Sequence, residues 1–282
     1  MIRERIVGVG RRLVRRPPVP PPVRLVEVRP PNDLLAGRTA LVVGGGRIGR
    51  ATSELFLSAG ARVHQADVRP GLAPPGATEH VVDVADTASI DELWNALGSP
   101  VDILVNAAGY QPPVAAFVDA DPAQWRRTFD TNVIGQMYLT QLVGRELKKS
   151  HTPGSMVLIA SAHHAITGGW PAYSASKAAL VMFMREIALE WASSGIRINA
   201  IAPGWVAHPD EPHANDFPHT PLGSCAIPPH YIAQAALFLC SDRAAFTTGS
   251  VMHVDGGLSL RSYRTAALTD RADPHVRRFD SG

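Results

Sequence analysis

Tyr173 and Lys177 lie four residues apart in a stretch with helical periodicity. At this spacing two side chains share one face of a helix, one turn from each other. A phenol beside an ammonium group ionises more easily, so the pair predicts a general acid/base with Tyr173 as the proton carrier. A free Tyr titrates near ~10, and work at neutral pH needs a shift of roughly 3 units, which Lys177 and a second positive charge together would supply. An isolated pair of this kind is more often structural, so the rest of the sequence must show whether this pair is catalytic.

Alternating strand and helix patterns surround this pair from residue 39 onward. The predicted strands are residues 39–43, 62–67, 80–82, 102–106, 155–160, 196–201 and 250–254. The predicted helices are a segment ending near residue 59, then 87–97, 122–148 with Asp121 as its N-cap, 171–192 and 228–240. Short apolar strands that alternate with helices predict an α/β fold with a doubly wound parallel sheet.

Composition and charge narrow the class of protein. The chain has 282 residues, 45% of them hydrophobic and 18% charged, and no apolar run long enough to cross a membrane. Cys225 and Cys240 have no metal-binding or redox spacing, which favours a reducing, cytoplasmic compartment. Residues 1–30 carry a net charge of +6 and residues 258–282 one of +2, so residues 31–257 carry −6. We therefore expect neither a nucleic-acid partner nor an integral membrane contact.

A glycine-rich turn follows the first predicted strand. Gly44-Gly45-Gly46-Arg47-Ile48-Gly49 fits the pattern GxGxxG between a strand and a helix. In this context the glycines allow a tight turn and close approach of a pyrophosphate to the helix N-terminus. The pattern alone is weak, and a turn that merely needs unusual dihedral angles is the alternative. The strand and helix that flank it favour a dinucleotide site.

Acidic residues at the ends of the next two strands bear on the choice of nucleotide. Asp67 ends the second strand 18 residues after Gly49, where a carboxylate binds a ribose 2′-hydroxyl and repels a 2′-phosphate. NAD(H) is therefore preferred, and NADP(H) remains possible because Arg47 and Arg69 offset the repulsion. Asp83 and Val84 follow the third strand. They are expected to meet the adenine, although a loop or helix-capping role for the Asp is equally compatible with its position.

With these features in place, the chain resembles the short-chain dehydrogenase/reductase (SDR) family over about residues 36–257. The matching motifs, in chain order, are the glycine-rich turn, Asn106-Ala107-Ala108-Gly109, Asn132, Ser161, Tyr173-x-x-x-Lys177, Pro203-Gly204 and Asp255-Gly256-Gly257. Each is weak alone, but seven in this order are specific. The resemblance implies a Rossmann fold with strand order 3-2-1-4-5-6-7. It also implies an NAD(P)(H)-dependent oxidoreductase that transfers a hydride between a nicotinamide and a secondary alcohol or ketone.

The resemblance also implies a role for each matching residue. Tyr173 would exchange a proton with the substrate oxygen, and Ser161 would hydrogen-bond that oxygen. Lys177 would bind the nicotinamide ribose and lower the Tyr pKa, and Asn132 would hold a water that leads to solvent. The remaining cofactor-binding residues would be Asn106, Ala107 and Gly109 on the adenosine side, and Pro203, Gly204 and Val206 beyond the sixth strand.

Three departures from the family pattern bear on the site. The glycine turn is one residue shorter than the common form and begins with Val43 where Thr is usual. Ser161 precedes Tyr173 by twelve residues where thirteen is commoner. His208 stands where a Thr often contacts the nicotinamide carboxamide. A non-redox enzyme or a nucleotide-binding protein on the same scaffold is therefore the alternative reading.

The chain divides into three predicted parts. These are a basic, Pro-rich extension (1–36), a dinucleotide-binding catalytic domain (37–257) with a substrate lid (205–226), and a C-terminal tail (258–282). His163, Trp205 and His208 are the candidate substrate-lining residues, and no metal site is expected because no His pair has a metal-binding spacing on a helix. The resemblance implies a homotetramer or homodimer, with dimer faces on the Tyr173 helix and the helix before it.

Overall fold

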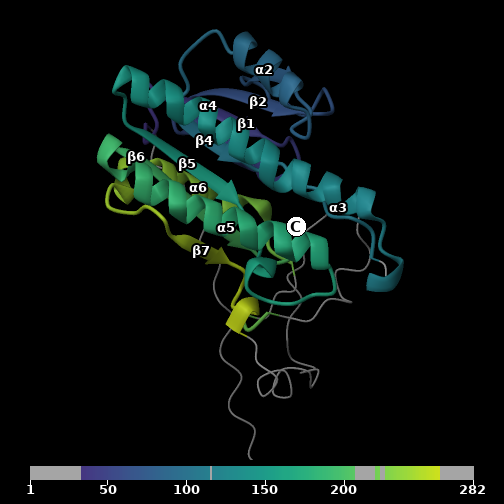
Figure 1. The fold of residues 1–282 in the computed structure, drawn as a ribbon. Coiled ribbons are helices and arrows are strands. Elements are labelled where there is room, and N and C mark those ends of the chain that lie inside the picture. The colour runs from purple at the N-terminus through teal and green to yellow at the C-terminus, as the bar shows by residue number, and fades with distance from the viewer. Residues whose placement is uncertain (1–32, 115, 207–219, 223–225, 261–282) are drawn as a thin grey trace, which may run out of the picture.

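The computed structural model describes residues 33–114, 116–206, 220–222 and 226–260. Seven strands form one sheet in the order β3-β2-β1-β4-β5-β6-β7, and neighbouring strands pair in parallel. Helices cover both faces of this sheet (Figure 1). The structure confirms the predicted Rossmann fold and its strand order.

The first half of the sheet holds the nucleotide-binding motif. Its elements are β1 (Thr39–Val43), α1 (Arg47–Ser58), β2 (Arg62–Asp67), β3 (Thr78–Val81), α2 (Thr87–Ala96) and β4 (Ile103–Asn106). The third strand begins and ends earlier than the predicted 80–82. β3 is an edge strand with one apolar residue, so its bounds depend on pairing with β2, which composition does not reveal.

The second half holds the Tyr173 helix. Its main elements are α3 (Pro122–Phe129), α4 (Gly135–Ser150), β5 (Gly154–Ile159), α5 (Pro171–Trp191), β6 (Ile196–Pro203), α6 (Pro229–Cys240) and β7 (Val251–Val254). The single helix predicted over 122–148 is instead interrupted by a π-helical turn, Asp130–Ile134. Asp121 caps α3 as predicted, since its side chain accepts a hydrogen bond from the Ala123 N–H. Pi-helical turns are rare and concentrate at functional sites, and this one carries Asn132.

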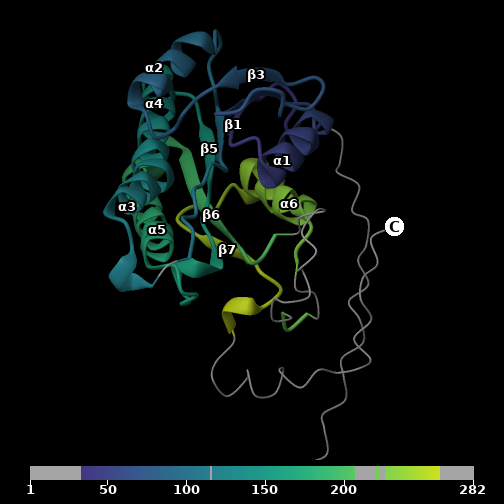
Figure 2. The same cartoon turned by 90° about the vertical axis from the view of Figure 1, so that its right-hand side faces the viewer.

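Two layers of helices enclose the sheet. Figure 2 shows α1 and α6 on one face and α2, α3, α4 and α5 on the other. Alternate residues of each strand feed the two cores, because successive side chains of a strand point to opposite faces. Leu41 and Val43 pack toward α4 and α5, whereas Ala40 and Val42 pack toward α1 and α6.

The described part of the chain begins ahead of the predicted boundary of the catalytic domain. Leu35 is fully buried in the core that includes α1, and its N–H donates to the Ala59 carbonyl oxygen at 2.8 Å. The body therefore includes residues ahead of the predicted boundary at 37. Most of the predicted extension, lid and tail, with His208 and Cys225, lies outside the described residues. Within the described residues, no helix is long and apolar enough to cross a bilayer.

Candidate active site

A cavity of about 700 Å³ opens at the carboxyl ends of the parallel strands. Its walls come from the segments after β1, β4, β5 and β6 and from the start of α5. Ligands of open α/β sheets bind at this edge, where the strand order reverses. The fold thus brings the glycine turn, Ser161 and the Tyr173 pair together around one cavity.

The glycine turn after β1 has no room for a Cβ at three positions, and at Gly45 it would lie 2.7 Å from Leu72 Cβ. Gly44 has a φ of +100°, and a Cβ added to it would lie 2.5 Å from the Ala108 nitrogen. A Cβ added to Gly49 would lie 1.6 Å from the Gly44 carbonyl oxygen. At Gly46 nothing lies within 4 Å, and α1 begins there without a side-chain cap. The turn therefore leaves the first N–H groups of α1 available to an anion.

Asp67 ties the end of β2 to this turn. One carboxylate oxygen accepts from the Gly45 N–H at 2.6 Å and the other from the Arg69 N–H at 2.9 Å. Arg47, the residue after Gly46, directs its guanidinium across to the Val206 carbonyl oxygen, 2.7 Å away. A carboxylate and a cation thus lie on two sides of the same turn.

The two residues expected at the adenine are arranged differently from each other. Asp83 is exposed, and its carboxylate accepts from the Ala85 N–H at 2.9 Å, which is the predicted loop alternative, whereas Asp86 caps α2. The Val84 side chain is only 6% exposed and belongs to the core around α2 and α4. An adenine contact of Val84 would therefore have to come from its backbone.

The turn after β4 links the nucleotide side of the cavity to the Tyr173 helix. Ala107 and Gly109 line the cavity, whereas Asn106 is fully buried and donates to the Gln136 carbonyl oxygen at 3.3 Å. A Cβ added to Gly109 would lie 3.6 Å from Lys177 Nζ and 3.7 Å from the Asn132 side-chain oxygen. A larger residue at this position would press on both groups.

Tyr173 and Lys177 lie on one face of α5, as the spacing predicts. Lys177 Nζ is 5.7 Å from the centre of the Tyr173 ring and donates to the Ile159 carbonyl oxygen at 2.8 Å. Ser161 lies close enough to the Tyr173 hydroxyl to lower its pKa, although these residues are only twelve apart. The shortened spacing therefore does not separate the serine from the tyrosine.

Asn132 is fixed by three hydrogen bonds on the π-helical turn. Its side-chain oxygen accepts from the Tyr110 N–H at 2.7 Å, and its amide donates to the Tyr110 carbonyl oxygen at 2.8 Å. The same amide donates to Ser176 Oγ at 3.0 Å, and that hydroxyl in turn donates to the Tyr173 carbonyl oxygen at 2.7 Å. Asn132 therefore connects the turn after β4 to the first turns of α5.

Burial dominates the electrostatics of the Tyr–Lys pair. It raises the pKa of the Tyr173 phenol, which the Ser161 hydrogen bond partly opposes. It lowers the pKa of Lys177 to about 8, because the ammonium group is enclosed in protein. In the chain alone, the Tyr173 pKa thus moves opposite to the direction expected from a neighbouring ammonium. The sequence analysis predicted a lowered Tyr173 pKa only with a second positive charge besides Lys177.

His163 forms an aromatic wall next to Tyr173. Its ring is edge-on to the rings of Trp170 and Tyr173, with centroids 5.4 and 5.7 Å apart, and its Nδ1 lies 3.3 Å from Ser174 Oγ. Burial lowers the pKa of His163, so its ring is neutral at pH 7. A Cβ on Gly168 would lie 1.9 Å from this ring, so only glycine leaves it space.

A family model described as enoyl-(acyl carrier protein) reductase matches residues 45–259, which include the site residues described above except Gly44. A solved structure titled a short chain dehydrogenase/reductase family protein superimposes with a TM-score of 0.72 at 34% identity, over 80% of this chain and 99% of that one. The chain belongs to the short-chain dehydrogenase/reductase family. It is an NAD(P)-dependent oxidoreductase.

Curated relatives of this SDR protein act on small alcohols and ketones. Galactitol 2-dehydrogenase (L-tagatose-forming) of Cereibacter sphaeroides is 34% identical over 80% of this chain and 96% of its own length. L-Xylulose reductase of Homo sapiens is 35% identical over 79% of this chain and 97% of its own length. A structure of 4-hydroxyisoleucine dehydrogenase complexed with NADH, 26% identical, has a TM-score of 0.74 over 80% of this chain and all of that one.

The residues around the cavity fit a nicotinamide dinucleotide. The uncapped start of α1 and the open face of Gly46 suit a pyrophosphate, and the Asp67 carboxylate suits a ribose hydroxyl. Such a group, when bound, gives or takes the hydride. The described residues contain no cluster of three His, Cys, Asp or Glu side chains that would hold a metal ion.

The sequence analysis did not single out two residues of the site, Gln136 and Thr220. Gln136 is fully buried on α4 and donates to the Ala108 carbonyl oxygen at 2.8 Å, which fixes the turn after β4. Its position four residues after Asn132, on the same helix face, is the one clue. Thr220 lines the cavity from a segment far along the chain. Of the predicted substrate-lining residues, His163 and Trp205 line the cavity.

Proposed function

We propose that this SDR enzyme oxidises a secondary alcohol, or reduces its ketone, with NAD(H), and that Tyr173 is the general acid/base. The observation that carries the proposal is that Tyr173 and Ser161 line one cavity, with the buried Lys177 one helical turn from Tyr173. In oxidation, Tyr173 as phenolate takes the hydroxyl proton while the carbinol carbon releases a hydride. In reduction, the phenol returns that proton to the carbonyl oxygen.

The other three residues support this proton transfer. Ser161 binds the substrate oxygen and holds it against Tyr173. Lys177 binds the nicotinamide ribose, and its ammonium favours the phenolate. Asn132 anchors the proton path from Lys177 toward solvent. Its three hydrogen bonds fix the backbone of Tyr110 and the Ser176 hydroxyl on either side of it.

The remaining cofactor contacts follow the layout of the cavity. The turn from Gly44 to Gly49, which includes Gly46, Arg47 and Ile48, would hold the pyrophosphate. Asp67, Asp83 and the Val84 backbone would hold the adenosine, next to the turn formed by Asn106, Ala107 and Gly109. Pro203, Gly204 and Val206 would face the nicotinamide.

The Asp67 carboxylate supports a preference for NAD(H). Replacing Asp67 with Asn is expected to lower the ratio of kcat/KM for NAD⁺ to that for NADP⁺ by about tenfold, because one negative charge no longer repels the 2′-phosphate. Steady-state kinetics with both nucleotides measure this ratio. Glu92→Gln is the matched control, since Glu92 is an exposed carboxylate on α2 outside the cavity, and it is expected to leave the ratio unchanged. An unchanged ratio in Asp67→Asn would remove Asp67 from the ribose site.

The substrate proposal is a small polyol or the corresponding ketose. The named relatives act on galactitol and L-xylulose, and the cavity combines Trp170 and Trp205 with the polar, neutral ring of His163. The test is a panel of polyols and simple secondary alcohols incubated with NAD⁺ while NADH absorbance is followed. NADH formation that depends on Tyr173 supports the proposal, and turnover that persists in Tyr173→Phe contradicts it.

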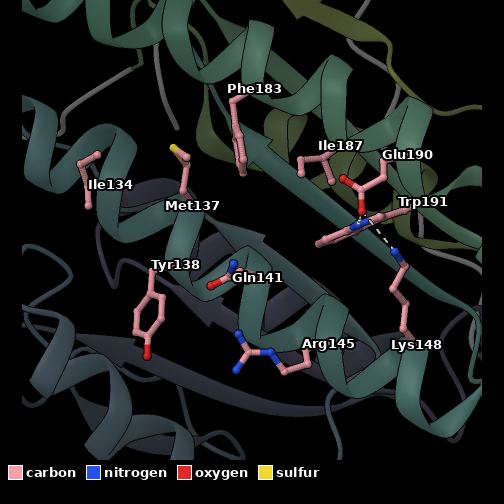
Figure 3. A pocket seen from close by; sticks show the side chains of 10 residues that line it. All are labelled: Ile134, Met137, Tyr138, Gln141, Arg145, Lys148, Phe183, Ile187, Glu190 and Trp191. Atoms are coloured by element: carbon pink, nitrogen blue, oxygen red, sulfur yellow. Dashed lines mark hydrogen bonds and ion pairs between the residues drawn. The ribbon is translucent and has the colours of Figure 1, made fainter.

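We also propose that the enzyme self-associates through α4 and α5, as a homodimer or homotetramer. A groove of about 520 Å³ lies between these helices, lined by Met137, Phe183 and Trp191 among others (Figure 3). On α5, Leu189 is 80% exposed in the single chain. Leu189→Glu is expected to shift the molar mass measured by light scattering toward the monomer, because it buries a charge in the contact. An unchanged mass would place the contact elsewhere.

A further inference from the structure

Gln136 is a polar residue on the buried face of α4. It is fully buried, one and two helical turns before Leu139 and Val143 of the core around α2 and α4. Its side-chain oxygen, Oε1, has no hydrogen-bond partner among the described residues. A buried carboxamide with an unpaired oxygen costs the fold free energy that an apolar side chain of similar size does not. The carboxamide is therefore not explained by stability alone.

The nitrogen of the same carboxamide holds the turn after β4. Gln136 Nε2 donates to the Ala108 carbonyl oxygen at 2.8 Å, and the Gln136 backbone carbonyl accepts from the Asn106 side chain at 3.3 Å. Asn132, four residues earlier, accepts from the Tyr110 N–H and donates to the Tyr110 carbonyl oxygen. Two residues of one helical segment thus fix the start, the middle and the end of the turn from residue 106 to residue 110.

This turn lies between the glycine turn and the Lys177 ammonium group. A Cβ added to Gly44 would lie 2.5 Å from the Ala108 nitrogen, so the glycine turn packs directly against the Ala108 peptide. A Cβ added to Gly109 would lie 3.6 Å from Lys177 Nζ. Ala107 and Gly109 themselves line the cavity. A shift of the Ala108 peptide would therefore displace the cavity wall next to both groups.

Gly135, the residue before Gln136, brings the same helix against the segment after β3. A Cβ added to Gly135 would lie 1.7 Å from the Val84 carbonyl oxygen. A larger residue would push α4 away from the backbone to which the proposed function assigns the adenosine. Residues 135 and 136 of α4 therefore set the positions of two neighbouring cofactor-binding segments.

We propose that Gln136 is a cofactor-positioning residue, whose side-chain amide holds the turn after β4 where the dinucleotide needs it. Gln136 does not line the cavity, so it acts through Ala107, Ala108 and Gly109. The required group is the N–H donor, because the Ala108 carbonyl can only accept. The inference rests on the proposed NAD(H) function.

Replacing Gln136 with Met tests the donor. Met is also long and unbranched and suits a helix, but it has no N–H. Isothermal titration of the full-length variant is expected to show roughly three- to tenfold weaker binding of NADH than wild type, the worth of one hydrogen bond. ADP-ribose, which lacks the nicotinamide but keeps both riboses, is expected to weaken by the same factor. Substrate KM at saturating NADH is expected to be unchanged.

Thermal stability separates this role from a purely structural one. Without nucleotide, Gln136→Met is expected to keep or raise the Tm, because it removes the buried unpaired oxygen. The half-buried Ala108 carbonyl can then turn toward water. Thr140→Val is the matched control: Thr140 is fully buried one turn further along α4, and its Oγ1 donates to the Gln136 carbonyl oxygen at 2.7 Å. It is expected to leave both dissociation constants unchanged.

Gln136→Glu adds a readout that only a donor role would move. A buried carboxyl group has a raised pKa, so its protonated form can donate to the Ala108 carbonyl, whereas its carboxylate cannot. The ratio of the NADH dissociation constant of this variant to that of wild type is therefore expected to rise between about pH 6 and pH 9.

Four results would overturn the inference. These are unchanged NADH binding in Gln136→Met, a weakening of NADH without a weakening of ADP-ribose, an equal loss of affinity in Thr140→Val, and a pH-independent ratio in Gln136→Glu. In each of them wild type binds both ligands, so the proposed function stands. If wild type binds neither NADH nor ADP-ribose, the proposed function fails and the inference fails with it.

Discussion

Replacing Tyr173 with Phe is expected to reduce kcat by a factor of about 10² to 10⁴, the usual contribution of a positioned acid/base. The substitution keeps the ring that packs edge-on against His163 and removes only the hydroxyl. NADH affinity is therefore expected to change little. Single-turnover measurements with saturating nucleotide isolate the chemical step from binding and product release.

Tyr231→Phe is the control for this substitution. Tyr231 lies on α6 and packs against the core that includes α1, away from the cavity. It is expected to retain full kcat and the wild-type Tm. If Tyr173→Phe turned over the true substrate at the wild-type rate, the proton would have to come from another group and the proposed role of Tyr173 would fail.

Replacing Lys177 with Met is expected to stabilise the nucleotide-free protein while reducing kcat at least a hundredfold. Burial lowers the Lys177 pKa from 10.5 to about 8, so the charged form costs the fold up to about 3 kcal/mol at pH 7. Loss of the bond to the Ile159 carbonyl oxygen offsets about 1 kcal/mol of this gain. Chemical denaturation measures the net change in the free energy of unfolding.

The pH dependence of this gain has a defined sign. Between pH 8 and 10.5 the unfolded chain holds the Lys177 proton and the folded chain does not, so wild-type stability rises with pH there. The advantage of Lys177→Met is therefore largest below pH 8 and disappears above pH 10.5. Lys148→Met, which removes a partly exposed partner of Glu190, is expected to be nearly neutral at all pH values. Equal behaviour of the two variants would show that the buried ammonium carries no penalty.

The positions of most strands were predictable because parallel strands are buried on both faces. β1, β4 and β5 read as continuous apolar runs and were located within one or two residues. β3 was not, because an edge strand with a single apolar residue takes its bounds from pairing with β2. The interruption of the helix over 122–148 was also missed. Its residues keep helical periodicity, and the π-helical turn comes with the contacts of Asn132.

Within the site, the Tyr173–Lys177 pair also has properties that the sequence predicts and properties that only the packing determines. Their spacing on α5 and the order of the seven motifs are properties of the sequence, and they were enough to identify the family and the reaction class. The tertiary structure decided what the spacing could not. It brings Ser161 and Tyr173 to one cavity across a shortened loop, encloses the Lys177 ammonium so that its pKa falls to about 8, and brings Thr220 to the same cavity. Burial and long-range contact set these properties, and both depend on how distant segments pack.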